Sequence, residues 1–240
     1  MAGEPPTPKL SVVIPAYNEE QRLPRTIEQV ERFLHSRPDP YELILVDDGS
    51  ADGTRDVMDR AEARYGTVRI EVLPQNRGKG RALAVGVAAA RGAEVLVTDA
   101  DLSTPIDELP KLQAALDAGA GIAIASRAVK GSRVEISQPF YRVLMGKAFN
   151  LIVQLFLLPG IWDTQCGFKL FRADVAHEVF ARLSTDGFGY DPEVLYRAKQ
   201  KGVRIVEVPV VWRNSAPTKV LAFRSSLDMF LHVLRIRFGR

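Results

Sequence analysis

The sequence has little of the chemistry on which extracellular and zinc-binding proteins depend. Its 240 residues include one cysteine, Cys166, so no disulfide can form within the chain and a reducing compartment is favoured. The three histidines lie far apart, which excludes the paired Cys and His spacing of a zinc site. No apolar stretch reaches the roughly 20 residues that a membrane-spanning helix needs. We therefore expect neither a disulfide scaffold nor a chain that crosses a bilayer.

An excess of one charge is also missing. The 32 Lys and Arg residues face 29 Asp and Glu residues, and the net charge of +3 is too small to indicate a nucleic-acid partner. The hydrophobic fraction of 46% and the charged fraction of 25% are typical of a soluble globular protein. We predict a disordered Pro-rich leader over residues 1–9, a single domain over 10–215 and a basic amphipathic helix over 216–240.

Strand-length and helix-length segments alternate through the first half of the chain. Apolar runs lie at 10–15, 41–46, 68–73, 94–98 and 121–126, separated by segments of helical spacing at about 19–36, 52–65, 79–90 and 107–118. Continuous Val, Ile and Leu runs, such as 43–46, are typical of strands buried on both faces. This pattern predicts an α/β fold with a mostly parallel central sheet and flanking helices.

The second half has a different rhythm. Residues 138–162 are rich in large apolar side chains, and we expect a helical segment that faces an acceptor or a membrane. Further strands are predicted at 167–171 and 203–211, and a further helix at 191–201.

Polar side chains gather where the predicted strands end, which is where parallel sheets bind ligands. Asp99 and Asp101 follow the fourth strand two residues apart and point the same way if the chain stays extended. Two such carboxylates suit a hard cation, Mg²⁺ or Mn²⁺, that also binds phosphate. The alternative is a solvated turn rich in Asp.

Two glycine-containing turns follow other strands. Residues 76–80, Asn-Arg-Gly-Lys-Gly, open a predicted helix, and a basic turn at a helix N-terminus suits phosphate. A plain surface turn is the alternative there. Asp47 and Asp48 precede Gly49, and one of them could accept hydrogen bonds from a base or ribose, or could simply cap a turn.

Taken in order, these segments resemble the family-2 inverting glycosyltransferases, over roughly residues 10–215. The segments are Pro15-Ala16-Tyr17-Asn18-Glu19, Asp47-Asp48-Gly49-Ser50, Asn76-Arg77-Gly78-Lys79-Gly80 and Asp99-Ala100-Asp101. Residues 98–105, 163–171 and 187–195 are more similar to the polyprenyl-phosphate branch, nearest the dolichyl-phosphate β-glucosyltransferase subgroup. The resemblance implies a GT-A type nucleotide-diphospho-sugar transferase fold.

The resemblance also implies a role for each matching residue. The nucleotide donor is expected beside Pro15, Tyr17, Glu19, Asp47, Asp48, Arg77 and Lys79. Asp99 and Asp101 would hold Mg²⁺ or Mn²⁺, with Ser103 where the mannose synthases usually carry a third, Gln, ligand. The acceptor phosphate is expected beside Arg127, Arg142 and Lys147, and the sugar beside Gln165, Asp191 and Glu193. Of these, the residues expected to act in catalysis are Asp101, Arg127, Arg142 and Asp191.

The implied reaction is inverting transfer of a hexose, glucose from UDP-glucose, to polyprenyl or dolichyl phosphate. A phosphate monoester has a second pKa of about 6 and is largely dianionic at neutral pH, so it needs no strong base. Ser103 argues against GDP-mannose as the donor, although GDP-mannose, UDP-galactose and UDP-N-acetylglucosamine remain open. The same residues are compatible with a hydroxyl acceptor that uses Asp191 as base, and with a nucleotide-sugar-binding protein that has no catalytic activity.

A lipid acceptor requires contact with a membrane. Residues 221–240 combine Arg224, Arg235, Arg237 and Arg240 with apolar residues at helical spacing. Such a helix lies in the membrane interface and is drawn to anionic lipid, or else it packs on the core or on a second copy of the chain. We expect a cytoplasmic protein associated peripherally with the inner face of the membrane.

Overall fold

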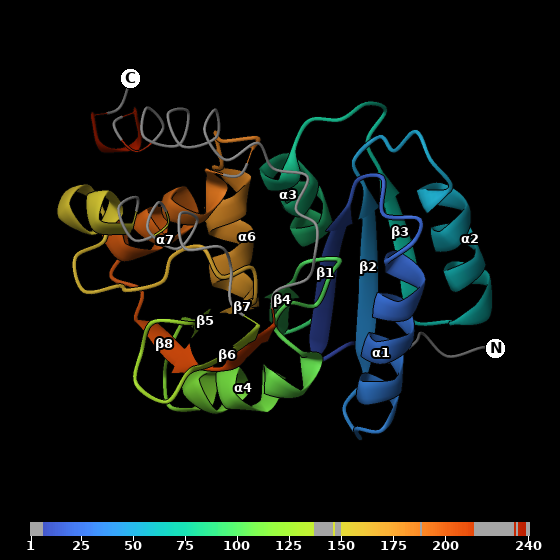
Figure 1. Cartoon of the computed structure of the whole chain (residues 1–240), viewed down its shortest axis with the longest axis horizontal. Coiled ribbons are helices and arrows are strands. Elements are labelled where there is room, and N and C mark those ends of the chain that lie inside the picture. The colour runs from blue at the N-terminus through green and yellow to red at the C-terminus, as the bar shows by residue number, and fades with distance from the viewer. Residues whose placement is uncertain are drawn as a thin grey trace.

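The computed structural model describes residues 7–136, 146, 150–187, 189–213, 233 and 235–238. A seven-stranded sheet forms the centre of the molecule (Figure 1). Its strands are, in spatial order, β3 (Val68–Val72), β2 (Tyr41–Asp47), β1 (Leu10–Ala16), β4 (Glu94–Val97), β7 (Lys169–Arg172), β5 (Ile122–Ser126) and β8 (Ile205–Pro209). Only β7 runs antiparallel to its neighbours, so the prediction of a mostly parallel sheet is confirmed.

Helices cover both faces of this sheet. One hydrophobic cluster joins it to α1 (Leu23–His35), α2 (Thr54–Arg64) and α4 (Leu109–Asp117), which follows a 3-10 turn, η1 (Ile106–Glu108). The other joins it to α3 (Lys79–Ala89), α6 (Ala173–Ala181) and α7 (Tyr190–Gln200). Figure 1 shows α3, α6 and α7 on the side of the sheet opposite α4. The fold is therefore a three-layer α/β/α arrangement.

The strand sequences account for these two clusters. In β1, Val12 and Ile14 belong to one cluster and Val13 to the other, and all three side chains have no exposed surface. Successive strand side chains point to opposite faces, so a continuous apolar run fills both layers at once.

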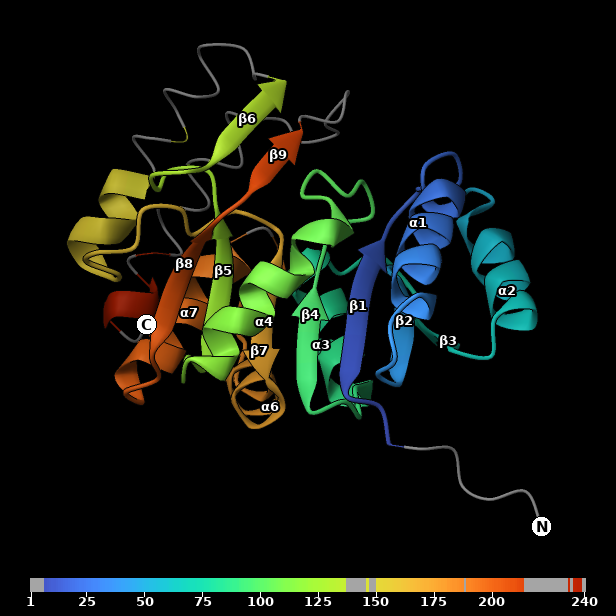
Figure 2. The ribbon, with the colours of Figure 1, turned by 90° about the horizontal axis from the view of Figure 1, so that it is seen from below.

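One predicted strand was wrong. Residues 203–211 do not form a single strand but divide into β8, in the main sheet, and β9 (Val211–Arg213). β9 pairs with β6 (Arg133–Ile136), and Figure 2 shows both projecting beyond the edge where β5 and β8 end. Pro209 has no N–H to continue the ladder beside β5, and the carbonyl of Val210 instead accepts a hydrogen bond from Arg133 at 3.0 Å. β6 and α6 were not predicted.

Parts of the apolar segment and of the C-terminal helix lie outside the described residues, including Arg142 and Lys147. Of the former, residues 150–156 are helical; of the latter, 235–238 are helical. Val233 packs in the same cluster as Val153 and Leu157, so the two segments meet on one side of the molecule. Within the described residues, no helix combines the length and apolarity needed to cross a membrane.

Candidate active site

A cavity of about 440 Å³ opens at the carboxyl ends of β1, β2 and β4. Its volume lies within the range of small-molecule sites. The cavity is lined by Pro15, Ala16, Tyr17, Glu19, Arg22, Asp48, Asn76, Gly78, Lys79, Ala82, Asp99, Ala100 and Asp101. Four segments that are distant in sequence therefore meet at one edge of the sheet, as the topology of a parallel sheet requires.

The glycine-rich turn forms one wall of this cavity. Asp48, at the end of β2, accepts hydrogen bonds from the backbone N–H groups of Arg77 and Gly78, both at 2.8 Å, and from the Asn76 amide at 3.0 Å. Burial raises the pKa of Asp48, and the two backbone hydrogen bonds oppose that rise. Asp48 thus holds the turn in place where α3 begins, and Gly78 supplies the φ of +100° that the turn needs.

Opposite this turn, Lys79 forms an ion pair with Asp99. Burial disfavours the charged form of Lys79, but Asp99 and the nearby Asp191 outweigh it and keep the pKa well above its ordinary value. Gly167 lies against the same carboxylate, because a Cβ on Gly167 would stand 2.0 Å from Asp99 Oδ2. Asp99 is therefore held between a cation and a backbone that leaves no room for a side chain.

Asp101 lies beside Asp99 at the cavity edge, and its Oδ1 accepts a hydrogen bond from the Ser103 N–H at 2.9 Å. Among the described residues, no cluster of three or more His, Cys, Asp or Glu side chains could enclose a metal ion. Two carboxylates at an open edge instead match a cation that takes its remaining ligands from phosphate and water.

The far end of the cavity is built from the loop after β1. Tyr17 is 41% exposed and lines the wall beside Pro15. Glu19 forms a bidentate pair with Arg22, with N···O distances of 2.6 and 2.7 Å. Arg22 was not predicted as a site residue, although its position three residues after Glu19 is a signal for such a pair.

Three expected donor-site residues do not line the cavity. Asp47 is buried, and its Oδ1 accepts a hydrogen bond from the Ser50 N–H at 2.9 Å, so it closes the turn after β2. The Arg77 side chain turns toward Asp186 and pairs with it at 2.9 Å. Ser103 contributes its backbone to Asp101 and, at 2.8 Å, to Arg213 on β9.

Two residues expected beside the sugar occupy different surroundings. Asp191 is buried and forms an ion pair with Lys169, which is also buried. The ring of Tyr190 lies between that lysine and Lys79, at 6.0 and 5.5 Å from the two ammonium nitrogens. Glu193 has no exposed surface. Neither carboxylate lines the cavity, and the sequence offered no sign of Lys169 as a partner.

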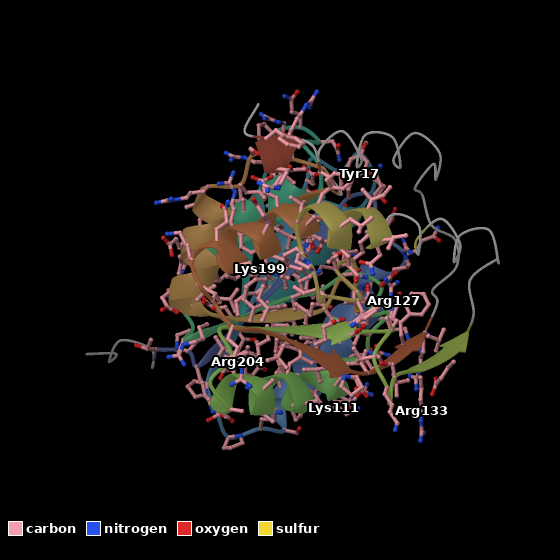
Figure 3. All side chains as sticks on the ribbon, turned by 90° about the vertical axis from the view of Figure 1, so that its left-hand side faces the viewer. Tyr17, Lys111, Arg127, Arg133, Lys199 and Arg204 are labelled. Carbon is pink, nitrogen blue, oxygen red and sulfur yellow. The ribbon has the colours of Figure 1, made fainter. Side chains whose placement is uncertain are left out.

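Arg127 follows β5 and binds Asp163 in a bidentate ion pair, at 2.7 and 2.8 Å, while its guanidinium stacks 5.3 Å from the Trp212 ring centroid. Burial disfavours the charge, but Asp163 outweighs it and raises the pKa of Arg127. Figure 3 shows Arg127 on the side of the molecule where β6 carries Arg133. Gln165 lies in the same loop, with its N–H 3.3 Å from Asp163.

Comparisons with known proteins agree with this geometry. Residues 11–180 match the family model described as glycosyl transferase family 2. The chain is 37% identical to a human dolichyl-phosphate β-glucosyltransferase, covering 97% of this chain and 76% of the relative. It is 38% identical to a dolichyl-phosphate β-glucosyltransferase from Drosophila melanogaster, covering 93% and 73% of the two chains.

Solved structures show the same fold. Glucosyl-3-phosphoglycerate synthase from Mycobacterium tuberculosis, in complex with Mn²⁺, UDP-glucose and phosphoglyceric acid, superposes with a TM-score of 0.74. The alignment covers 97% of this chain and 80% of that one at 19% identity, which shows a common fold.

Proposed function

The chain belongs to glycosyl transferase family 2 and is a glycosyltransferase, and from this premise we propose that it transfers glucose from UDP-glucose to dolichyl or polyprenyl phosphate. In-line attack by the lipid phosphate inverts the anomeric carbon and gives a β-linked product. The support is the similarity to two dolichyl-phosphate β-glucosyltransferases over nearly the whole chain.

The observation that carries the donor half is the arrangement around the cavity. A glycine-rich turn at the start of α3 faces two carboxylates at the end of β4, with Lys79 between them. A nucleoside diphosphate fits such a wall, because a helix N-terminus and a lysine both favour negative charge. The nucleoside then lies toward Tyr17 and the Glu19–Arg22 pair.

The same arrangement suits a divalent cation, Mg²⁺ or Mn²⁺. Asp99 and Asp101 are its two carboxylate ligands, and Ser103 is the candidate for a third. Bound there, the cation supplies positive charge against the leaving diphosphate. Lys79, paired with Asp99 in this structure, lies close enough to the turn to bind the diphosphate once Asp99 is engaged.

The surroundings of Asp191 favour a phosphate acceptor over a hydroxyl acceptor. A hydroxyl nucleophile needs a general base within hydrogen-bonding reach, and Asp191 is buried in an ion pair with Lys169. A phosphate monoester needs no such base because it is already ionised. Arg127, with its planar fork, is the described residue suited to hold that phosphate.

We also propose that the protein binds the cytoplasm-facing membrane surface peripherally. Large apolar side chains are exposed on and near the helical residues 150–156, and Phe238 is 66% exposed. The exposed members of the first group are Leu151, Leu155, Phe156 and Trp162. Arg235 and Arg237 lie beside Phe238 and suit anionic lipid.

A donor panel tests the reaction. Purified protein, polyprenyl phosphate and Mn²⁺ are incubated with UDP-glucose, UDP-galactose, UDP-N-acetylglucosamine or GDP-mannose, and the lipid fraction is analysed by mass. We expect a hexosyl phospholipid from UDP-glucose. Product from another donor would correct the sugar, and glucose transfer to a hydroxyl acceptor without lipid would refute the acceptor.

Flotation with anionic liposomes tests the membrane surface. Leu155→Gln removes a side chain that is 72% exposed, and Val72→Gln on β3 is the matched control at 48% exposure. We expect Leu155→Gln to reduce the floated fraction and Val72→Gln to leave it unchanged. Equal flotation of both variants would exclude this surface.

A further inference from the structure

Glu193 is the most completely bonded carboxylate on α7. Its Oε1 accepts hydrogen bonds from the N–H and hydroxyl of Ser184, at 2.9 and 2.8 Å, and from two guanidinium nitrogens of Arg197, at 2.9 and 2.6 Å. Its Oε2 accepts one from the Thr185 N–H at 3.0 Å. A buried charge is tolerated only with such compensation. Glu193 therefore fastens residues 184–185 to α7.

The other side of this segment lies directly on the glycine-rich turn. A Cβ on Gly80 would stand 2.3 Å from the Thr185 carbonyl oxygen, and one on Gly78 would stand 2.7 Å from that of Asp186. The Asp186 carbonyl also accepts a hydrogen bond from the Arg81 N–H at 3.1 Å. The segment and the turn touch through backbone, so a shift of one is transmitted to the other.

The turn is thus held from two directions. Asp48 binds its N–H groups from the end of β2, and residues 184–186 press on it from the side of α7. Gly78 and Lys79, between these supports, line the cavity. A displacement of the turn would move Lys79 away from Asp99 and from any bound diphosphate.

We propose that Glu193 is a positioning residue of the donor site, acting through residues 184–186 on the turn that binds the diphosphate. This inference rests on the proposed function, since it assumes that a nucleoside diphosphate occupies the cavity. Glu193→Gln replaces one acceptor oxygen by an NH₂ group that faces N–H donors and leaves Arg197 without its counter-ion. The supporting contact then loosens while the cavity residues themselves are unchanged.

The test compares UDP affinity, with Mn²⁺ present, by calorimetry in the wild type and in three variants. Glu193→Gln should weaken UDP binding by about tenfold, and should raise the KM for the donor far more than it lowers kcat. Asp186→Asn, which removes only the exposed pair with Arg77, should weaken binding by about threefold. Glu178→Gln, which removes the exposed pair with Lys201, is the control and should bind UDP as the wild type does.

The outcomes separate the two proposals. A wild type that binds no UDP would refute the donor site itself. A wild type that binds UDP, with Glu193→Gln folded, less heat-stable and equal in affinity, would show that Glu193 only stabilises the fold and would overturn the inference. If Glu193→Gln does not fold, Asp186→Asn decides, and wild-type affinity in that variant would overturn it.

Discussion

Gly167→Ala offers a sharp test of the site because the change lies outside the cavity lining. The new Cβ would stand 2.0 Å from Asp99 Oδ2, 2.6 Å from its Cγ and 2.9 Å from its Oδ1. Ordinary contact begins near 3.4 Å, so the carboxylate must move by about 1.4 Å. The side chain of Asp99 is 36% exposed and has room to move, and Gly167 does not have a positive φ. We therefore expect the variant to fold.

The expected cost falls on activity. Mg²⁺ binds oxygen ligands at about 2.0–2.1 Å, so a shift of this size breaks a ligand bond. A misplacement of about 1 Å can reduce a rate roughly 100-fold, equivalent to about 2.7 kcal/mol in the activation free energy. We expect a fall of that order in kcat/KM for glucosyl transfer and a higher Mn²⁺ concentration for half-maximal rate.

Gly66→Ala is the matched control, because its new methyl group would meet nothing within 4 Å. Circular dichroism and thermal unfolding would establish that both variants are folded. If Gly167→Ala kept its rate within twofold of the control, at an unchanged Mn²⁺ requirement, Asp99 would not need its observed position and the reasoning would be refuted.

Three further predictions concern neighbouring carboxylates. Asp101→Asn keeps an oxygen for the Ser103 N–H but loses the charge, so most transferase activity should disappear with little change in Tm; near wild-type turnover in Mn²⁺ would contradict this. Lys169→Met leaves Asp191 as an unpaired buried charge and should lower the unfolding free energy by about 3–5 kcal/mol in urea titrations, whereas a shift under 1 kcal/mol would show that the pair is dispensable. Burial raises the pKa of Glu193, but hydrogen bonds from Thr185, Ser184 and Arg197 outweigh it and hold that pKa below its ordinary value of 4.5. This stabilisation is complete above pH 4.5 and is lost as the pH falls through the folded-state pKa, so the Tm gap between wild type and Glu193→Gln should narrow in acid; a constant gap would argue against an ionised Glu193.

Much of the site was predictable because its residues follow strands. The runs that form β1, β2 and β4 are apolar on both faces, and topology brings the carboxyl ends of parallel strands to one edge. Asp48, Lys79, Asp99 and Asp101 therefore meet around one cavity, as their positions in the sequence predicted.

The partners of the buried charges were not predictable in this way. Nothing local connects Lys169 with Asp191, or Glu193 with residues 184–185, because each contact depends on how α7 packs against distant elements. The division of 203–211 into β8 and β9 depends likewise on β6, a strand with no apolar run of its own.

Hydrophobic period, turn chemistry and the order of the motifs are properties of short stretches, so the sequence by itself determined the α/β architecture, the family resemblance and the edge of the sheet that carries the site. Tertiary structure alone decided which carboxylates face the cavity and which are neutralised in the interior. Asp99 lines the cavity beside Lys79, whereas Glu193 is enclosed beneath residues 184–186. The physical reason is that a charge is solvated, paired or available for binding according to what packs around it, and that is set by contacts between segments far apart in the chain.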